Sequence, residues 1–444
     1  MIYPVHQATM AAAADNKEPF LHQDSHHPGL GSVLRAFFPI GFLSFGGTAA
    51  NMAMFMKLMV EELKWVSKTQ YSELLGLCQS LPGPSAAQIL LCTVTVATGR
   101  PSCGIIALLF FMIPASIVLA LLGSQLGKTE DLSERLNDYH IKAELVENWS
   151  ASIGCVAIAL VAGGAWELGQ KCAVDKLTKC IWLGTCLVCF ATLHLTELNA
   201  PLTLGCLVFS AVAALAYYPA NTQDTSSADI VAVGISSLAG YFLFWIGWVL
   251  LAVLFIWPLF AELPPTLAMI APYYRVGCLV FGGGPVVIPL LLFQLVSIQA
   301  ITSKQFSLGF AAVQLMPGPM FNLSAFTGAL HHGFSGALLC WAAMILPGIS
   351  MALGALPFYV KLRREDRVQR ALKGVNSAAA GLMGSALLLL WQEFVDLDKH
   401  SSVKRICLSL LLTGSQQIFS VKAYWLVLIG LSLGALATAF DILI

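Results

Sequence analysis

The chain has 444 residues, of which 57% are hydrophobic and only 11% are charged, whereas about a quarter of the residues of a typical soluble protein are charged. This composition excludes a water-soluble globular protein. It predicts an all-α polytopic membrane protein in a lipid bilayer, because many apolar runs approach the ~20 residues that a spanning helix needs. The net charge is zero, so no basic excess points to nucleic acid as a partner.

Residues 1–30 are polar and lack the basic-then-apolar order of a signal peptide. We expect a disordered tail here. Three of its histidines, His22, His26 and His27, have the chemistry to bind a transition metal, but a solvated tail is the interpretation that we favour. The sequence contains no other histidine spacing typical of a metal site and no nucleotide-binding loop. We therefore expect no metal, no cofactor and no enzyme active site.

About thirteen apolar segments follow the tail. In chain order they are residues 33–56, 71–98, 102–123, 151–169, 179–196, 200–218, 233–259, 270–297, 305–330, 334–359, 371–393, 404–419 and 424–443. We interpret them as membrane-spanning helices. A basic stretch at residues 361–373 marks the cytoplasmic side under the positive-inside rule, which also places the N-terminus in the cytoplasm. The plasma membrane is the expected location.

Two stretches of the first half recur in the second half. Residues 44–48, SFGGT, recur as residues 280–285, VFGGGP. Residues 78–84, CQSLPGP, recur as residues 313–319, VQLMPGP. In each half, nearly the same interval separates the phenylalanine of the first stretch from the first proline of the second. This order and spacing predict two homologous halves.

A third landmark, Pro114 in the first half and Pro347 in the second, extends the repeat. We predict a first repeat at residues 31–218, a linker with one extra apolar segment at 219–263, and a second repeat at 264–444. An odd number of spans would separate equivalent helices. We therefore expect two inverted helical repeats with broken helices.

Each Pro-Gly-Pro motif is expected to break a helix, because proline lacks a backbone donor and clashes with the preceding turn. Pro84 and Pro319 suit the first turn of a new helix, and Ser85 with Gln88 has the spacing of a capping box. Two such N-termini, each with free N–H groups and the positive end of a helix dipole, would form an anion site near the middle of the membrane. Structural kinks are the alternative interpretation.

The glycines of the Phe-Gly-Gly motif also allow two interpretations. Small residues let helices pack closely in lipid, and a glycine run can instead unwind a helix so that its N–H groups line a cavity. For Gly282, Gly283 and Gly284, which precede a proline, we favour the unwound backbone. For Gly46 and Gly47 both interpretations stay open.

The candidate substrate-binding residues belong to these two motifs or are polar side chains near them. They are Phe45, Gly46, Gly47, Asn51, Gln79, Pro82, Gly83, Pro84, Gln88, Arg275, Gly282, Gly283, Gly284, Gln314, Pro317, Gly318, Pro319, Asn322 and Thr327. Their amides and hydroxyls can donate to an anion without the cost of burying a charge. Arg275 is either a counter-charge for the anion or a side chain that reaches the lipid headgroups.

The motifs that carry a family resemblance are Phe45-Gly46-Gly47, residues 79–84 with Gln88, and residues 281–289, 314–319, 326–328 and 346–358. With these motifs in this order, the sequence resembles the chromate ion transporter family in its long-chain, two-domain form. The resemblance implies a membrane carrier that moves chromate, commonly outward, and confers chromate resistance. Sulfate is a chemically similar oxyanion. Family members often have histidine where this chain has Asn51 and Pro285, so neither position is titratable here.

We therefore predict a transporter that holds chromate, a tetrahedral oxyanion, between the two half-helices and exposes it to either side by alternating access. A transporter of sulfate or another anion is the nearer alternative. A membrane-embedded enzyme or a lipid-handling protein is the more distant alternative, and it would need clustered ionisable residues within the spans, which are almost absent. Assembly as a homodimer stays open.

Overall fold

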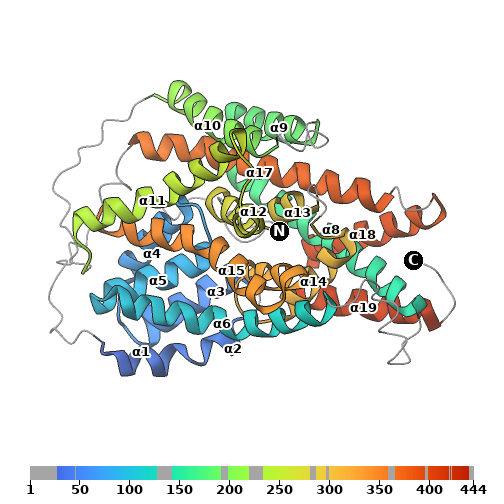
Figure 1. Cartoon of the computed structure of the whole chain (residues 1–444), viewed down its shortest axis with the longest axis horizontal. Coiled ribbons are helices and arrows are strands. Elements are labelled where there is room, and N and C mark those ends of the chain that lie inside the picture. Colours follow the sequence, from blue (N-terminus) through green and yellow to red (C-terminus); the bar gives the residue numbers. More distant parts are fainter. Residues whose placement is uncertain are drawn as a thin grey trace, which may run out of the picture.

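The computed structural model in Figure 1 describes residues 28–45, 47–127, 143–191, 199–219, 234–280, 287–296, 300–358, 366–395, 399–419, 421 and 423–439. The secondary structure of these residues is helical and contains no strand, so the predicted all-α fold class is confirmed. Three of the described helices are long and apolar enough to cross a membrane: Pro101–Leu126, Ser237–Ile256 and His332–Phe358. The tail histidines His22, His26 and His27 lie outside the described residues.

Two apolar segments of the first half are each divided into several helices. They are α1 (Leu30–Phe37), α2 (Ile40–Leu43), α3 (Gly47–Met56), a π-helix (Lys57–Glu62), α4 (Lys68–Ser80), α5 (Ser85–Thr98), α6 (Pro101–Leu126), α8 (Ala143–Cys172), α9 (Lys176–Ala191) and α10 (Asn199–Tyr217). The stretch 33–56, expected as one helix, is divided at Pro39 and again at Ser44. The stretch 71–98 is divided at the first Pro-Gly-Pro motif.

The linker contributes α11 (Ser237–Ile256) and a 3-10 helix (Trp257–Leu259). The described helices of the second half are α12 (Pro265–Leu279), α13 (Val287–Val296), α14 (Ser303–Leu315), the 3-10 helix η4 (Met320–Asn322), α15 (Leu323–Ala355), the 3-10 helix η5 (Leu356–Phe358), α17 (Asp366–Val395), α18 (Lys399–Phe419) and α19 (Ala423–Ala439). Helix α15 is kinked at Gly333, where φ is 57° and ψ is −145°.

Helices α4 and α14 begin in the same way. The hydroxyl of Ser67 accepts from the backbone N–H of Gln70 at 3.1 Å, and the side chain of Gln70 accepts from the N–H of Ser67 at 3.0 Å. Thr302 and Gln305 form the same reciprocal pair at the start of α14. These capping boxes satisfy two N–H groups that a helix start otherwise leaves free. Both helices are 13 residues long and end at a Pro-Gly-Pro motif.

Helices α6 and α15 form the central contact between the halves. Gly123 and Gly127 of α6 lie directly against the backbone of Phe326 and Leu330, and a Cβ at either glycine would overlap a carbonyl oxygen of α15. Such close approach of small residues is typical of helices that associate in lipid. Helices α11 and α12 also pack against α15, so the linker is attached to the same central helix.

The long peripheral helices are exchanged between the halves. Helix α17 of the second half packs against α9 and α10 of the first half, as Figure 1 shows. Helix α8 of the first half packs against α18 and α19 of the second half. Both α8 and α17 are 30 residues long. A long helix of each half therefore packs against the last described helices of the other half.

Polar contacts also connect the ends of these peripheral helices. Asp175, between α8 and α9, accepts from the backbone N–H of Thr178 at 2.9 Å and from the hydroxyl of Tyr218. Arg370, in the first turns of α17, donates to the carbonyl oxygens of Leu215 at 3.0 Å and Tyr218 at 2.8 Å. The free carbonyls at the end of α10 thus receive a cationic donor, which is favourable at a helix C-terminus.

Candidate functional site

Each Pro-Gly-Pro motif forms a turn after a helix. The residue before the first proline is extended, with φ −97° and ψ 150° at Leu81 and φ −96° and ψ 151° at Met316, because a following proline disfavours the helical conformation. The glycines have φ of +120° at Gly83 and +103° at Gly318, values that residues with a side chain rarely adopt. The two turns therefore follow nearly the same backbone path.

Each turn binds the chain of the other half by one backbone hydrogen bond. The N–H of Gly83 donates to the carbonyl oxygen of Val280 at 2.8 Å, and the N–H of Gly318 donates to the carbonyl oxygen of Ser44 at 2.9 Å. Val280 and Ser44 are the residues that directly precede the two Phe-Gly-Gly motifs. The four motif copies are thus brought together in two pairs, and each pair contains one motif from each half.

The turns also lie against the third landmark of the opposite half. A Cβ at Gly83 would lie 2.7 Å from the Cα of Gly348, the residue after Pro347 in α15. A Cβ at Gly318 would lie 3.2 Å from the carbonyl oxygen of Phe111 and 3.8 Å from the Cβ of Ala115, the residue after Pro114 in α6. All three landmark motifs therefore meet at the contact between the halves.

The capping box predicted at Ser85 and Gln88 is wrong. The N-cap of α5 is Pro84, and no side chain caps it. Gln88 Nε2 instead donates to the carbonyl oxygens of Pro82 at 2.7 Å and Gly348 at 3.0 Å, because the missing side chain at Gly348 lets the turn approach α15. Both amide hydrogens are used, so Gln88 supports the first turn in this conformation and has no free donor for an anion.

Asn322 supports the second turn in a similar way. Its Nδ2 donates to the carbonyl oxygen of Met112 in α6 at 3.1 Å, and its Oδ1 accepts from Trp341 Nε1 at 3.0 Å. The hydroxyl of Thr327, one turn further along, accepts from the hydroxyl of Tyr273 at 3.1 Å. Trp341 and Tyr273 were not predicted from the sequence, since an aromatic residue in an apolar run has the pattern of a core residue.

Two polar side chains next to the first Phe-Gly-Gly motif are buried without a hydrogen-bond partner among the described residues. The hydroxyl of Ser44 and both amide atoms of Asn51 are in this state, and each residue is 1% exposed. Asn51 lies one helical turn before Phe55, on the same face of α3, and the Phe55 ring contacts that of Phe111 with centroids 5.2 Å apart. The carbonyl of Phe111 faces Gly318, so the contact of Phe55 with Phe111 brings α3 close to the second turn.

The two turns differ in exposure. Residues 316–318 are half-buried, whereas the equivalent residues 81–83 are buried. Among the other candidates, Phe45 and Gln79 are exposed, and Gly47 begins α3 with φ of +80°. Gly46, Gly282, Gly283 and Gly284 lie outside the described residues. The unwound backbone that we expect at Gly282, Gly283 and Gly284 therefore stays a prediction.

Arg275 contacts the linker helix. Its Nη2 donates to the carbonyl oxygen of Leu254 at 2.7 Å, and its guanidinium carbon lies 5.0 Å from the centre of the Phe255 ring. This combination of a hydrogen bond and a cation–π contact holds the charge against α11. In this conformation the guanidinium is therefore bound to the linker helix.

Comparison with known proteins identifies the family. The family described as chromate transporter matches residues 31–218 and 267–435. The "Probable chromate transport protein" of Synechococcus elongatus is 27% identical, with 83% of this chain and 86% of the relative covered. The "Chromate transport protein" of Cupriavidus metallidurans is 25% identical, with coverage of 83% and 84%, and that of Pseudomonas aeruginosa is 24% identical, with coverage of 80% of each chain. No solved structure matches. The resemblance carried by the motifs is confirmed, and the chain belongs to the chromate transporter family.

Proposed function

We propose that this protein is a multi-pass transporter that exports chromate across the plasma membrane by alternating access between two inverted repeats. The substrate is supported by the curated relatives, which are named chromate transport proteins and are covered over at least 80% of their length. The outward direction is the one that the family resemblance implies. The observation that carries the mechanism is the pair of exchanged hydrogen bonds, from Gly83 to Val280 and from Gly318 to Ser44.

An inverted relation between residues 31–218 and 264–444 accounts for several contacts at once. Equivalent turns bind equivalent backbone positions of the opposite half, and equivalent long helices, α8 and α17, pack against the last helices of the opposite half. A two-fold relation produces such reciprocal contacts, because whatever the first half does to the second, the second does to the first. Reciprocal contacts of this kind are not expected between two unrelated halves.

The proposed substrate site lies at the two turns. A helix that starts after a break presents free N–H groups and a positive dipole end, which attract an anion without a charged side chain. Broken helices at equivalent positions of two repeats are also the usual place for a transporter's binding site. The arrangement suits a tetrahedral dianion, whose oxygens accept hydrogen bonds from several directions.

Alternating access is supported by the unequal exposure of the two turns. Residues 316–318 are half-buried and the equivalent residues 81–83 are buried, although their backbone conformations are nearly equal. In an inverted repeat, exchanging the conformations of the two halves turns an opening on one side of the membrane into an opening on the other side. We propose that the halves exchange these environments as the substrate crosses.

The proposal is tested by measuring radiolabelled chromate in cells and in everted membrane vesicles, with and without the protein. Export predicts lower accumulation in cells and uptake into everted vesicles. Higher accumulation in cells would mean import. Flux of labelled sulfate, with no flux of chromate, would replace the substrate, and the absence of flux of either anion would refute transport of these oxyanions.

A pair of proline variants tests the broken helix directly. Pro317→Ala removes the residue that breaks the helix after α14 and is expected to stop chromate flux while the amount of protein in the membrane stays unchanged. Gln314→Ala, in the last turn of α14, should have the same effect. Pro219→Ala, at an exposed position after α10, is the matched control and should retain the wild-type rate. Wild-type flux in Pro317→Ala would remove the helix break from the mechanism.

A further inference from the structure

The two contacts between turn and motif have the same backbone hydrogen bond but different side chains. We call the contact of Gly318 with Ser44 the polar junction and that of Gly83 with Val280 the apolar junction. The backbone distances are 2.9 Å and 2.8 Å. The alignment of the two Phe-Gly-Gly motifs places Ser44 at the position of Val280 and Asn51 at that of Val287. The repeat is therefore asymmetric at these positions.

The polar junction contains hydrogen-bonding groups that the described residues leave unused. The Ser44 hydroxyl and the Asn51 amide are 1% exposed and have no described partner. A buried polar group without a hydrogen bond is unfavourable, and native structures contain few of them. Ser44 directly contacts a turn of the opposite half, and Asn51 follows it by seven residues, so two unused polar groups flank the Phe-Gly-Gly motif, and their position points to a ligand as the missing partner.

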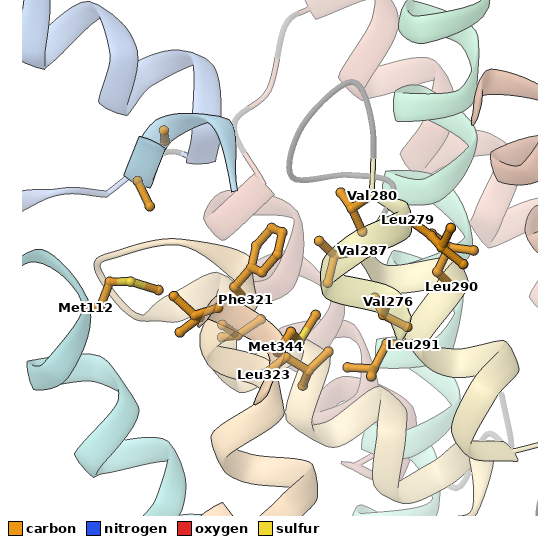
Figure 2. Packing of buried hydrophobic residues seen from close by; sticks show 14 of the residues in the cluster. Met112, Val276, Leu279, Val280, Val287, Leu290, Leu291, Phe321, Leu323 and Met344 are labelled. Carbon is orange, nitrogen blue, oxygen red and sulfur yellow. The ribbon is translucent and has the colours of Figure 1, made fainter. Parts of the chain in front are cut away.

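The apolar junction is filled by apolar side chains. Val280 and Val287 are both 0% exposed, and Figure 2 shows them close to the ring of Phe321, among other apolar side chains. The amide of Gln88 at the adjacent turn has both hydrogens bound to carbonyls. No donor of Gln88 is therefore available to an anion at this junction.

The polar junction is also the more accessible one. In the turn that carries it, residues 316–318 are half-buried, whereas the equivalent residues 81–83 of the apolar junction are buried. Arg275 is bound to Leu254 and Phe255 of the linker helix. The donors at the polar junction are thus neutral, as expected for an anion that must bind and leave during transport.

Building on the proposed function, we infer that the protein has one oxyanion site, located at the polar junction, and that Ser44 Oγ and Asn51 Nδ2 are its side-chain donors. The apolar junction serves as the structural counterpart and binds no substrate. Ser44 and Asn51 belong to the first half, and the Gly318 turn that binds Ser44 belongs to the second half, so the site lies at the boundary between the halves.

The test compares the KM for chromate of variants in everted vesicles. Ser44→Ala and Asn51→Leu each remove a donor to a charged ligand, and each is expected to raise the KM about tenfold or more. Asn51→Asp, which keeps the size but adds a negative charge, should raise it further. Ser44→Thr keeps the hydroxyl and should stay within about threefold of the wild type.

Val280→Ala and Val287→Ala are the matched controls at the equivalent positions, and their KM should stay within about threefold of the wild-type value. An unchanged KM in both Ser44→Ala and Asn51→Leu overturns the inference, and an equal rise in Val280→Ala replaces the single site by two. A changed sodium or proton dependence with an unchanged KM for chromate would make the junction a cation site. If the wild type itself moves no chromate, the proposed function fails instead.

Discussion

Trp341 Nε1 donates a hydrogen bond of 3.0 Å to Oδ1 of Asn322. Asn322 in turn donates from Nδ2 to the carbonyl of Met112 in the opposite half. A tryptophan in the second segment of α15 therefore orients an amide that holds the second turn against α6. The two residues lie on either side of the Gly333 kink, so the kinked helix folds back on the turn from which it starts.

The first prediction concerns this tryptophan. Trp341→Phe leaves Oδ1 of Asn322 buried without its donor, which we expect to cost about 1–3 kcal/mol of stability. The thermal unfolding midpoint of the purified protein in detergent measures the loss. Trp245→Phe, on the exposed face of α11, makes the same change without a buried partner and should alter stability by less than about 0.5 kcal/mol. Equal midpoints for the two variants would contradict the prediction.

The second prediction concerns the turn glycines. Both have positive φ, so Gly318→Ala should cost about 1–3 kcal/mol in backbone strain. Gly83→Ala should cost more, because its Cβ would also lie 2.7 Å from the Cα of Gly348, whereas the nearest atoms to a Cβ at Gly318 are 3.2 Å away. Gly76→Ala, in α4, meets no atom within 4 Å and should be neutral or stabilising. Protein level in the membrane and the unfolding midpoint give the order of the three.

The third prediction concerns Gln88. Gln88→Met keeps the length of the side chain but leaves the carbonyls of Pro82 and Gly348 without donors, which should cost about 2 kcal/mol or more. Gln88→Glu should be worse at neutral pH, because it places a carboxylate against two carbonyl oxygens. Gln125→Met, at an exposed position near the end of α6, is the control. A wild-type unfolding midpoint in Gln88→Met would show that the amide does not support the turn.

The fourth prediction is a pH dependence at the helix ends. Burial of Asp175 raises its pKa, but hydrogen bonds from Thr178 and Tyr218 outweigh this effect and hold the pKa below its ordinary value. Burial and the hydrogen bond to Asp175 raise the pKa of Tyr218 to about 12. A carboxyl with a lowered pKa stabilises the fold above its ordinary pKa and loses this contribution as the pH falls through the lowered value.

Tyr218→Phe should therefore lower the unfolding midpoint at neutral pH, and the difference from the wild type should vanish in acid. At the alkaline end, the wild type should lose the contribution of Tyr218 as the pH rises from the ordinary tyrosine pKa through about 12. Tyr217→Phe changes an exposed neighbour and should have no such pH dependence. A difference between Tyr218→Phe and the wild type that is constant with pH would exclude the titration.

The helix breaks at the two Pro-Gly-Pro motifs were predictable, because proline and glycine act locally. Pro82, Gly83 and their counterparts at 317–318 interrupt the helix whatever surrounds them. The capping box at Ser85 was not correct, because Gln88 found its partner in Gly348, which is distant in sequence. The contacts of the Arg275 guanidinium likewise depend on how the linker helix packs, and the sequence does not reveal this packing.

Ser44 belongs to the repeated motif, but the sequence did not single it out as a candidate binding residue. The repeat alignment places it opposite Val280, and this difference between otherwise similar motifs was the available signal. Its meaning depends on burial and on the missing hydrogen-bond partner, and both are properties of the folded chain. Trp341 had no signal of its own, because its partner Asn322 lies on the other side of a kink that is not evident from the sequence.

The exchange of α8 and α17 has a consequence for biogenesis. Helix α8 leaves the ribosome long before α18 and α19, against which it packs in the finished protein. Its contact surface must therefore stay in lipid, or on an insertion factor, until translation of the second half is complete. A chain that is stalled or cleaved in the linker would present this uncovered surface to the quality-control machinery of the membrane.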